Sequence, residues 1–249
     1  WRPVGDELAN IAVNALAMDP ANPDVIYAGT GEGYFREEVR GTSLPLRGGG
    51  IFKTEDAGES WEVLASTGGA SFQWVNDLVV SQLDGRRLYA AAREGVFRSK
   101  NGGKSWKRVL KTDVNGGCLD LAARTDRQSD YLLASCGTLA EATVYRKVKA
   151  QKGGRWKVAL ADGPEMGRTS LAIAPSNQDV VYALAASNVP GPEGRYEQAL
   201  HAVFRSDEGG APGSWRATVR NDDPRLINTL LLHNPIIATL VECGFQGPN

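Results

Sequence analysis

Two segments of the 249-residue chain gather aromatic rings, arginines and glutamates within a few positions of each other. The first spans residues 31–49 and the second spans residues 187–202. Aromatic rings beside arginine and glutamate suit contacts with carbohydrate or peptide, and the alternative is a pair of solvated surface loops with incidental charges. The candidate binding residues in these segments are Glu32, Tyr34, Arg36, Glu38, Arg195 and Tyr196.

Three further binding candidates lie in other predicted loops: Trp74, Arg168 and Arg225. Trp74 comes just before a predicted strand. We interpret it either as a stacking platform for a sugar ring or as a lid on the core.

Carboxylates in the same regions could perform catalysis. Glycoside hydrolysis requires two carboxyl groups at a defined separation, which depends on the fold. The candidates are Glu32, Glu38, Asp222 and Asp223.

Other kinds of site are excluded. The two histidines, His201 and His233, are too far apart in sequence for a multi-histidine metal site, and we expect no metal and no cofactor. The Gly-Thr-Gly-Glu-Gly run at 29–33 follows a strand pattern but opens no helix, so it is not a phosphate loop. A net charge of −1 argues against a nucleic-acid surface, and no apolar run is long enough to span a membrane.

The elements that must position these residues follow from a repeat of tryptophans. Trp1, Trp61, Trp106, Trp156 and Trp215 share one local context, at intervals of 60, 45, 50 and 59 residues. Periods of about 40–50 residues are typical of propeller blades, and the longer intervals indicate insertions.

Each repeat contains four short segments of alternating apolar and polar residues, which predict half-buried strands. We therefore predict an all-β fold, a β-propeller of four-stranded antiparallel blades forming a single region over residues 1–249. The predicted blades span residues 10–64, 71–110, 117–160 and 168–219, with a partial blade at 226–244.

The first and last units are incomplete, since Trp1 lacks three preceding strands and the fifth unit stops half-way. We expect the chain to be part of a longer protein and the propeller to be incomplete. The alternative is that the Trp1 strand pairs with the last strands and closes a five-bladed ring.

The turn before each tryptophan is the most specific motif. Two copies are near complete, Thr54-Glu-Asp-Ala-Gly-Glu-Ser-Trp61 and Ser99-Lys-Asn-Gly-Gly-Lys-Ser-Trp106. The copy before Trp215 is looser, and the third keeps only Gly154 and Trp156. An Asx side chain can accept backbone N–H bonds in a tight turn, and glycine permits a positive φ, so the motif is interpreted as a structural hairpin.

These hairpins resemble the Asp-box, or BNR, repeat S/T-x-D-x-G-x-x-W of sialidases, sortilin and the WD40/YVTN-BNR-like "glycosyl hydrolase" repeat proteins. The resemblance implies a propeller whose Asp-boxes lie on the face away from the active site. The Arg-Ile-Pro signature of sialidases is absent. The segment at 28–33 also lacks the aspartate of the Arg-Thr-Asp-x-Gly-Gly motif of xyloglucanase-like relatives.

The three cysteines are relevant to the cellular compartment of the protein. Cys118 and Cys136 are predicted to lie opposite each other on neighbouring strands, as a disulfide or as a buried pair of inert thiols. Cys243 is left over. Because proteins of the resembled class are mostly exported, we expect an extracytoplasmic location.

Two functions remain open at this point. The first is a non-catalytic extracytoplasmic propeller scaffold that binds glycan or protein through the loops at the propeller mouth. The second is a sialidase- or xyloglucanase-like glycoside hydrolase using paired carboxylates in the central cleft.

Overall fold

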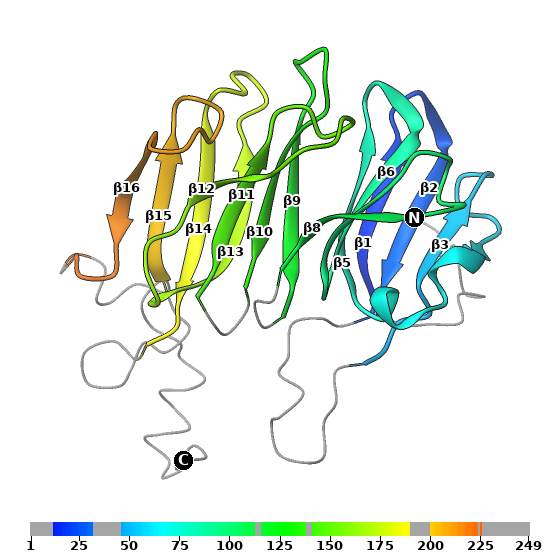
Figure 1. The fold of residues 1–249 in the computed structure, drawn as a ribbon, viewed down its shortest axis with the longest axis horizontal. Helices are drawn as coiled ribbons and strands as arrows, with labels where there is room; N and C mark the ends of the chain where they lie inside the picture. The colour runs from blue at the N-terminus through cyan, green and yellow to red at the C-terminus, as the bar shows by residue number, and fades with distance from the viewer. Residues whose placement is uncertain are drawn as a thin grey trace, which may run out of the picture.

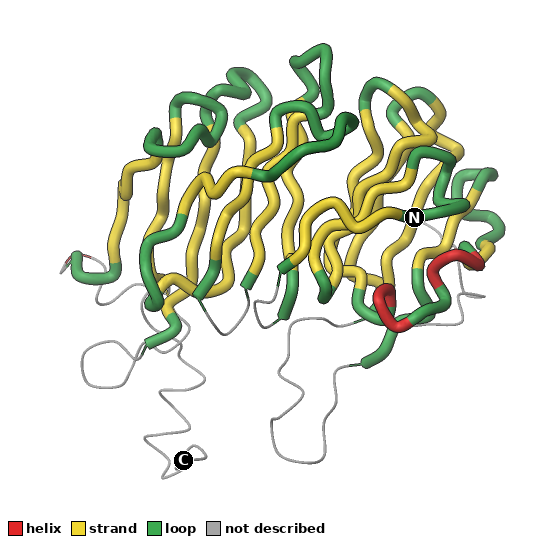
Figure 2. Tube along the Cα trace, viewed as in Figure 1, coloured by secondary structure: helices red, strands yellow, loops and turns green. Residues whose placement is uncertain are grey.

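A computed structural model describes residues 12–31, 46–112, 116–137, 141–189, 200–223 and 225. These residues form four four-stranded sheets, each built from four consecutive antiparallel strands. The described helices are two 3₁₀ turns, η1 (Ala65–Thr67) and η2 (Ala70–Phe72), drawn red in Figure 2. Neither is long enough or apolar enough to cross a membrane.

The strands follow the predicted repeat closely. The first sheet contains β1 (Val13–Asp19), β2 (Asn22–Thr30), β3 (Ile51–Thr54) and β4 (Glu62–Val63), and the second contains β5 (Val75–Ser81), β6 (Asp84–Ala92), β7 (Gly95–Ser99) and β8 (Lys107–Lys111). The third contains β9 (Cys118–Arg124), β10 (Tyr131–Cys136), β11 (Thr143–Lys147) and β12 (Lys157–Leu160), and the fourth contains β13 (Met166–Ile173), β14 (Val181–Ser187), β15 (Leu200–Ser206) and β16 (Trp215–Arg220).

The sheets stand side by side in chain order, from β1–β4 in blue and cyan to β13–β16 in yellow and orange (Figure 1). The first strands of neighbouring sheets, β1, β5, β9 and β13, lie next to each other and form the inner edge of the array. This arrangement confirms the predicted four-stranded antiparallel units. The predicted partial unit at 226–244 lies outside the described residues.

The position of a sheet in the array decides how its strands are buried. All six residues of β10 are buried, because its sheet has neighbours on both faces. In β14, on the last described sheet, burial alternates: Val181 and Ala183 are buried, whereas the side chain of Leu184 is 47% exposed. On the first sheet Leu16 of β1 is likewise 67% exposed.

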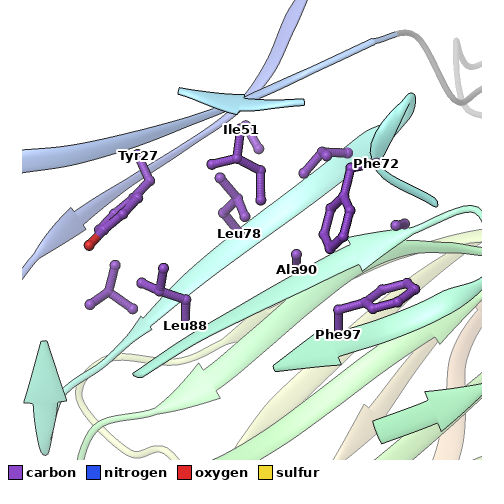
Figure 3. Packing of buried hydrophobic residues seen from close by; sticks show 11 residues of the cluster. Tyr27, Ile51, Phe72, Leu78, Leu88, Ala90 and Phe97 are labelled. Atoms are coloured by element: carbon purple, nitrogen blue, oxygen red, sulfur yellow. The ribbon is translucent and has the colours of Figure 1, made fainter. Parts of the chain in front are cut away.

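Large side chains fill the space between the first two sheets. Tyr27 and Ile51 of the first sheet face Leu78 and Leu88 of the second (Figure 3). Phe72, from η2, closes this core at one edge by packing against Phe97 with ring centroids 4.9 Å apart. Burying such side chains stabilises the fold by about 1.5–3 kcal/mol each.

A buried carboxylate joins the second sheet to the third. Asp130 accepts hydrogen bonds from Ser81 Oγ at 2.6 Å, from Arg87 Nη1 at 2.8 Å and from the Tyr89 hydroxyl at 2.7 Å. Burial raises the pKa of Tyr89, and its hydrogen bond to Asp130 adds to the rise. Because every donor reaches the carboxylate from the neighbouring sheet, the charge is compensated only when the two sheets are stacked.

The hairpins between the third and fourth strands of the first, second and fourth sheets have the hydrogen bonds that the turn motif predicts. Ser99 Oγ accepts the amide hydrogens of Asn101 at 3.3 Å and of Gly103 at 2.9 Å. The side chain of Asn101 in turn accepts the Ser105 amide at 3.0 Å. Thr54 in the first sheet and Ser206 in the fourth occupy the same place and accept the corresponding amides.

The predicted cysteine pair forms a disulfide. Cys118 and Cys136 are register partners on β9 and β10, and their sulfur atoms are bonded. The first of the two interpretations is therefore correct, and Cys243 lies outside the described residues.

Replacing the buried hydroxyl of a hairpin should cost stability. In Ser99→Ala the buried Gly103 amide loses its acceptor, so we expect the free energy of unfolding to fall by about 1–3 kcal/mol. Urea unfolding followed by tryptophan fluorescence measures this. Ser105→Ala, an exposed change in the same hairpin, is the matched control, and an equal loss in both variants would contradict the assignment.

One hairpin carries a strained residue that can be relieved. Ala57 has φ 59°, where its counterparts Gly102 and Gly209 have φ 67° and 62°. Its side chain is exposed, so Ala57→Gly loses no packing. Because the left-handed conformation suits glycine, we expect a gain of about 0.5–1 kcal/mol in unfolding free energy. A melting temperature equal to or below that of the wild type would contradict this.

Candidate functional site

Each inner strand begins with a shift in register that sets the place of its first polar side chains. In the pairing of β5 with β6 the shift falls between Val75 and Asp77, and in β13 with β14 it falls between Met166 and Thr169. Bulges of this kind redirect side chains and are common next to functional sites. Asp77 directly follows one bulge, and Arg168 lies within another.

Two aspartates occupy equivalent places on adjacent inner strands. Asp77 of β5 accepts the amide hydrogen of Leu121 in β9 at 2.7 Å. Asp120 of β9 accepts the amide hydrogen of Leu171 in β13 at 2.8 Å. Each carboxylate thus reaches across to the backbone of the next sheet. Sequence reasoning missed both residues, although an aspartate at the same position of two consecutive repeats was a signal for them.

The two buried carboxyl groups also affect each other's ionisation, so their protons are released as a pair. Burial raises the pKa of Asp77 to about 7, and the negative charge of Asp120 adds to the rise. Burial raises the pKa of Asp120 as well, while the Leu171 amide, Asp77 and Arg168 act in the opposite direction. The pair can hold a proton at neutral pH, as an acid–base group can.

Trp74 lies just before β5, at the edge of the sheets where the inner strands begin. Its side chain is only 6% exposed, and the guanidinium carbon of Arg93 lies 4.6 Å from the centre of its ring. A second guanidinium, from the exposed Arg47, lies at 6.0 Å. Of the two interpretations of Trp74, this environment favours the lid, with arginines as the groups that face outward.

The base of the first predicted loop is fixed to the same segment. The Gln73 carbonyl accepts the Gly48 amide at 2.7 Å. Gly31, with φ 101°, sits so close to the same carbonyl that a Cβ atom there would lie 2.2 Å from the oxygen. Gly31 and Gly48 are therefore anchored to this segment, and residues 32–45 lie outside the described residues.

A histidine–aspartate pair lies between the third and fourth sheets. His201 Nε2 is 2.9 Å from Asp162 Oδ2, and Arg220 donates to the same oxygen at 2.9 Å. Burial pulls the pKa of Asp162 upward, but the bonds from Arg220 and His201 outweigh it and keep that pKa below its usual value. His201 belongs to β15, so the second loop is shorter than the predicted 187–202.

The remaining candidates are dispersed. Arg168 is exposed on β13 near Asp120, whereas Arg225 is paired with Asp223. That pairing lowers the pKa of Asp223 to about 2, so this carboxylate stays ionised and suits no general-acid role. Within the described ranges no cluster of three or more His, Cys, Asp or Glu could hold a metal. Outside them lie Glu32, Tyr34, Arg36, Glu38, Arg195 and Tyr196.

Comparison with known structures decides the fold. A GH74 enzyme of Niastella koreensis is 19% identical, with a TM-score of 0.56, over 85% of this chain and 30% of that one. A GH74 xyloglucanase from Xanthomonas campestris is 19% identical, with a TM-score of 0.56, over 84% and 38%. PorZ, a surface component of the type-IX secretion system of Porphyromonas gingivalis, is 14% identical, with a TM-score of 0.52, over 82% and 26%. The fold is a β-propeller. At these identities the likeness extends to the fold alone.

Sequence comparison adds one relative. A xyloglucanase from a Paenibacillus species is 31% identical over 111 residues, which are 42% of this chain. The match spans only 10% of the length of that enzyme. No protein-family profile matches the chain.

The raised pKa of the buried Asp77 predicts a pH dependence of stability. The folded pKa of Asp77 lies above the unfolded value near 4, so the folded protein holds a proton that the unfolded chain releases as the pH rises from about 4 to about 7. We therefore expect this site to cost roughly 2 kcal/mol of unfolding free energy between pH 5 and pH 8. Asp77→Asn should flatten the slope, measured by urea unfolding across that range. Asp84→Asn, at the far end of the same sheet, is the control, and parallel slopes in wild type and Asp77→Asn would contradict the assignment.

Proposed function

We propose that the chain is a glycan-binding, non-catalytic region of an extracytoplasmic β-propeller protein, and that the ligand binds at the edge where the inner strands begin. The observation that carries the proposal is the arrangement of this rim. Arg47 and Arg168 are exposed there, and Arg93 covers Trp74. The guanidinium group of arginine donates several hydrogen bonds, which suits the hydroxyl oxygens of a sugar chain.

The carboxylates of the rim support binding over hydrolysis. Glycosidases place their two carboxyl groups about 5–9.5 Å apart, on opposite sides of the scissile bond. Asp77 and Asp120 instead each accept a backbone amide from the next sheet. Asp77 also accepts the Leu78 amide, so both of its oxygens and one oxygen of Asp120 already bind the backbone.

The class of glycan and the compartment have separate support. The sequence relative and several structural neighbours are xyloglucanases or GH74 enzymes, which makes xyloglucan the first ligand to test. The Cys118–Cys136 disulfide supports an extracytoplasmic location, because disulfides persist in oxidising compartments. The Asp-box hairpins support membership of the Asp-box propellers.

The exposed apolar faces support a larger assembly. On the first sheet Leu16 is 67% exposed and Met18 is 55% exposed. On the fourth sheet Leu184 is 47% exposed. In the inner sheets the corresponding faces are covered by a neighbour. We infer that residues 1–249 form one propeller region, and that further blades of a longer chain cover these faces.

A glycoside hydrolase is the second candidate, favoured by the similarity to the Paenibacillus xyloglucanase. Its carboxylates would be Glu32 and Glu38 in the first predicted loop. Release of reducing ends from xyloglucan, lost in Glu32→Gln or Glu38→Gln, would establish it.

Calorimetric titration with soluble xyloglucan oligosaccharides tests the proposal. We expect saturable binding without hydrolysis. Loss of the charged donor in Arg168→Ala should weaken binding roughly tenfold, and Tyr34→Ala should weaken it as well. Arg86→Ala is the matched control, since this exposed arginine lies at the other end of the second sheet. Absence of binding, or an equal effect of all three variants, would contradict the rim as the site.

A further inference from the structure

The third sheet carries a basic cavity in the hairpin that replaces its Asp-box. The cavity has a volume of about 410 Å³, within the range of ligand sites. It lies between the end of β11 and the start of β12, at the opposite edge of the sheets from the rim. The cations that line it are Arg146, Lys147, Lys149, Lys152, Arg155 and Lys157.

These cations have not been neutralised by the protein. The residues lining the cavity include no carboxylate, and among the described residues no acidic partner pairs with these six. The whole chain has a formal charge of −1, so the concentration of positive charge is local. A field of one sign in a concave surface concentrates oppositely charged ligands.

The cluster also lowers the stability of the third sheet, which a hairpin with only a structural role would avoid. Arg146 and Lys157 are directly opposite each other in the β11–β12 ladder. Like charges in cross-strand positions destabilise a sheet. A bound anion would relieve this repulsion.

The hairpin is built with the opposite polarity to the other three. Where Thr54, Ser99 and Ser206 accept amide hydrogens, Lys147 donates its ammonium hydrogens to the carbonyls of Gly153 and Arg155, both at 3.1 Å. The positive φ of Gly154, 106°, is retained. The turn is therefore folded by a cation in place of a hydroxyl.

The neighbouring sheet holds the hairpin in place. Arg98 of β7, which is 7% exposed, donates to the Ala150 carbonyl at 2.6 Å, and the Ala150 amide donates to the Asp130 carbonyl at 2.8 Å. Ala150 itself is buried. Because these bonds anchor the turn, its backbone is preformed, and binding has to order only the side chains.

We propose that this cavity binds a polyuronate, a linear polysaccharide with one carboxylate on each sugar unit. Six cations spread along a hairpin suit several anionic groups on one chain better than a single small anion. Lysine is a point charge that needs no fixed acceptor geometry, which suits carboxylates on a flexible polymer. The site lies at the other edge from the rim, so the proposal is independent of neutral-glycan binding there.

Titration of the full chain with polygalacturonate tests the proposal. We expect binding that weakens at least about tenfold when NaCl is raised from roughly 50 to 500 mM, because the contacts are exposed charges. Lys149→Glu combined with Lys152→Glu should weaken it by more than about tenfold, and xyloglucan binding should be unchanged.

A glycine offers the sharpest variant. A Cβ atom at Gly153 meets nothing within 4 Å, so Gly153→Asp adds a carboxylate to the cavity without steric conflict. Gly69→Asp, in the loop between η1 and η2, has the same charge change and the same open space, which makes it the matched control. Gly153→Asp should weaken polygalacturonate binding about tenfold while Gly69→Asp leaves it unchanged, with melting temperatures confirming that both fold.

Three outcomes would overturn the proposal. The first is no binding of polygalacturonate at low salt. The second is an equal affinity of Gly153→Asp and Gly69→Asp. The third is binding of poly-glutamate, dextran sulfate or duplex DNA as tightly as polygalacturonate, which would make the surface a general polyanion site.

Discussion

The structure depends on joining neighbouring sheets that share no backbone ladder. Each described sheet pairs only its own four strands, so the polar groups at the inner edge must find partners across a gap between sheets. Side chains reach those partners: Asp77 and Asp120 accept amides of the next sheet, and Asn76 donates to the Cys118 carbonyl at 2.8 Å. Apolar packing supplies most of the energy between sheets, but these directional bonds set their relative position.

The same bonds explain the chemistry of the rim. A carboxylate that accepts a buried amide is held close to its neighbour, and two carboxylates at that distance cannot both ionise easily. The raised pKa of Asp77 and of Asp120 is therefore a consequence of joining the sheets. Groups committed in this way are poor reactants, whereas Arg47 and Arg168 beside them remain exposed.

The four hairpins at the opposite edge show how one turn can be built in two ways. Three of them satisfy inward-pointing amides with a hydroxyl, as Ser99 does for Gly103. In the third sheet the ammonium of Lys147 instead donates to two carbonyls of the turn. Glycine with positive φ is needed in both, because the chain must reverse within the same space. In the third repeat, an ammonium donor thus replaces the hydroxyl acceptor of the motif. The turn is kept, and positive charge is added.

The sequence by itself determined the repeat, the four strands of each unit, the hairpins and the position of Cys118 opposite Cys136, because these depend on alternation and turn residues that are local in the chain. The structure decided that the two cysteines form a disulfide. The sequence also placed the first loop between the second and third strands of the first sheet. It could not reveal that Asp77 meets Asp120, 43 positions away, or that arginines cover Trp74. Those contacts arise only when separate sheets stack, since burial and the approach of like charges are properties of the assembled array and not of any one repeat.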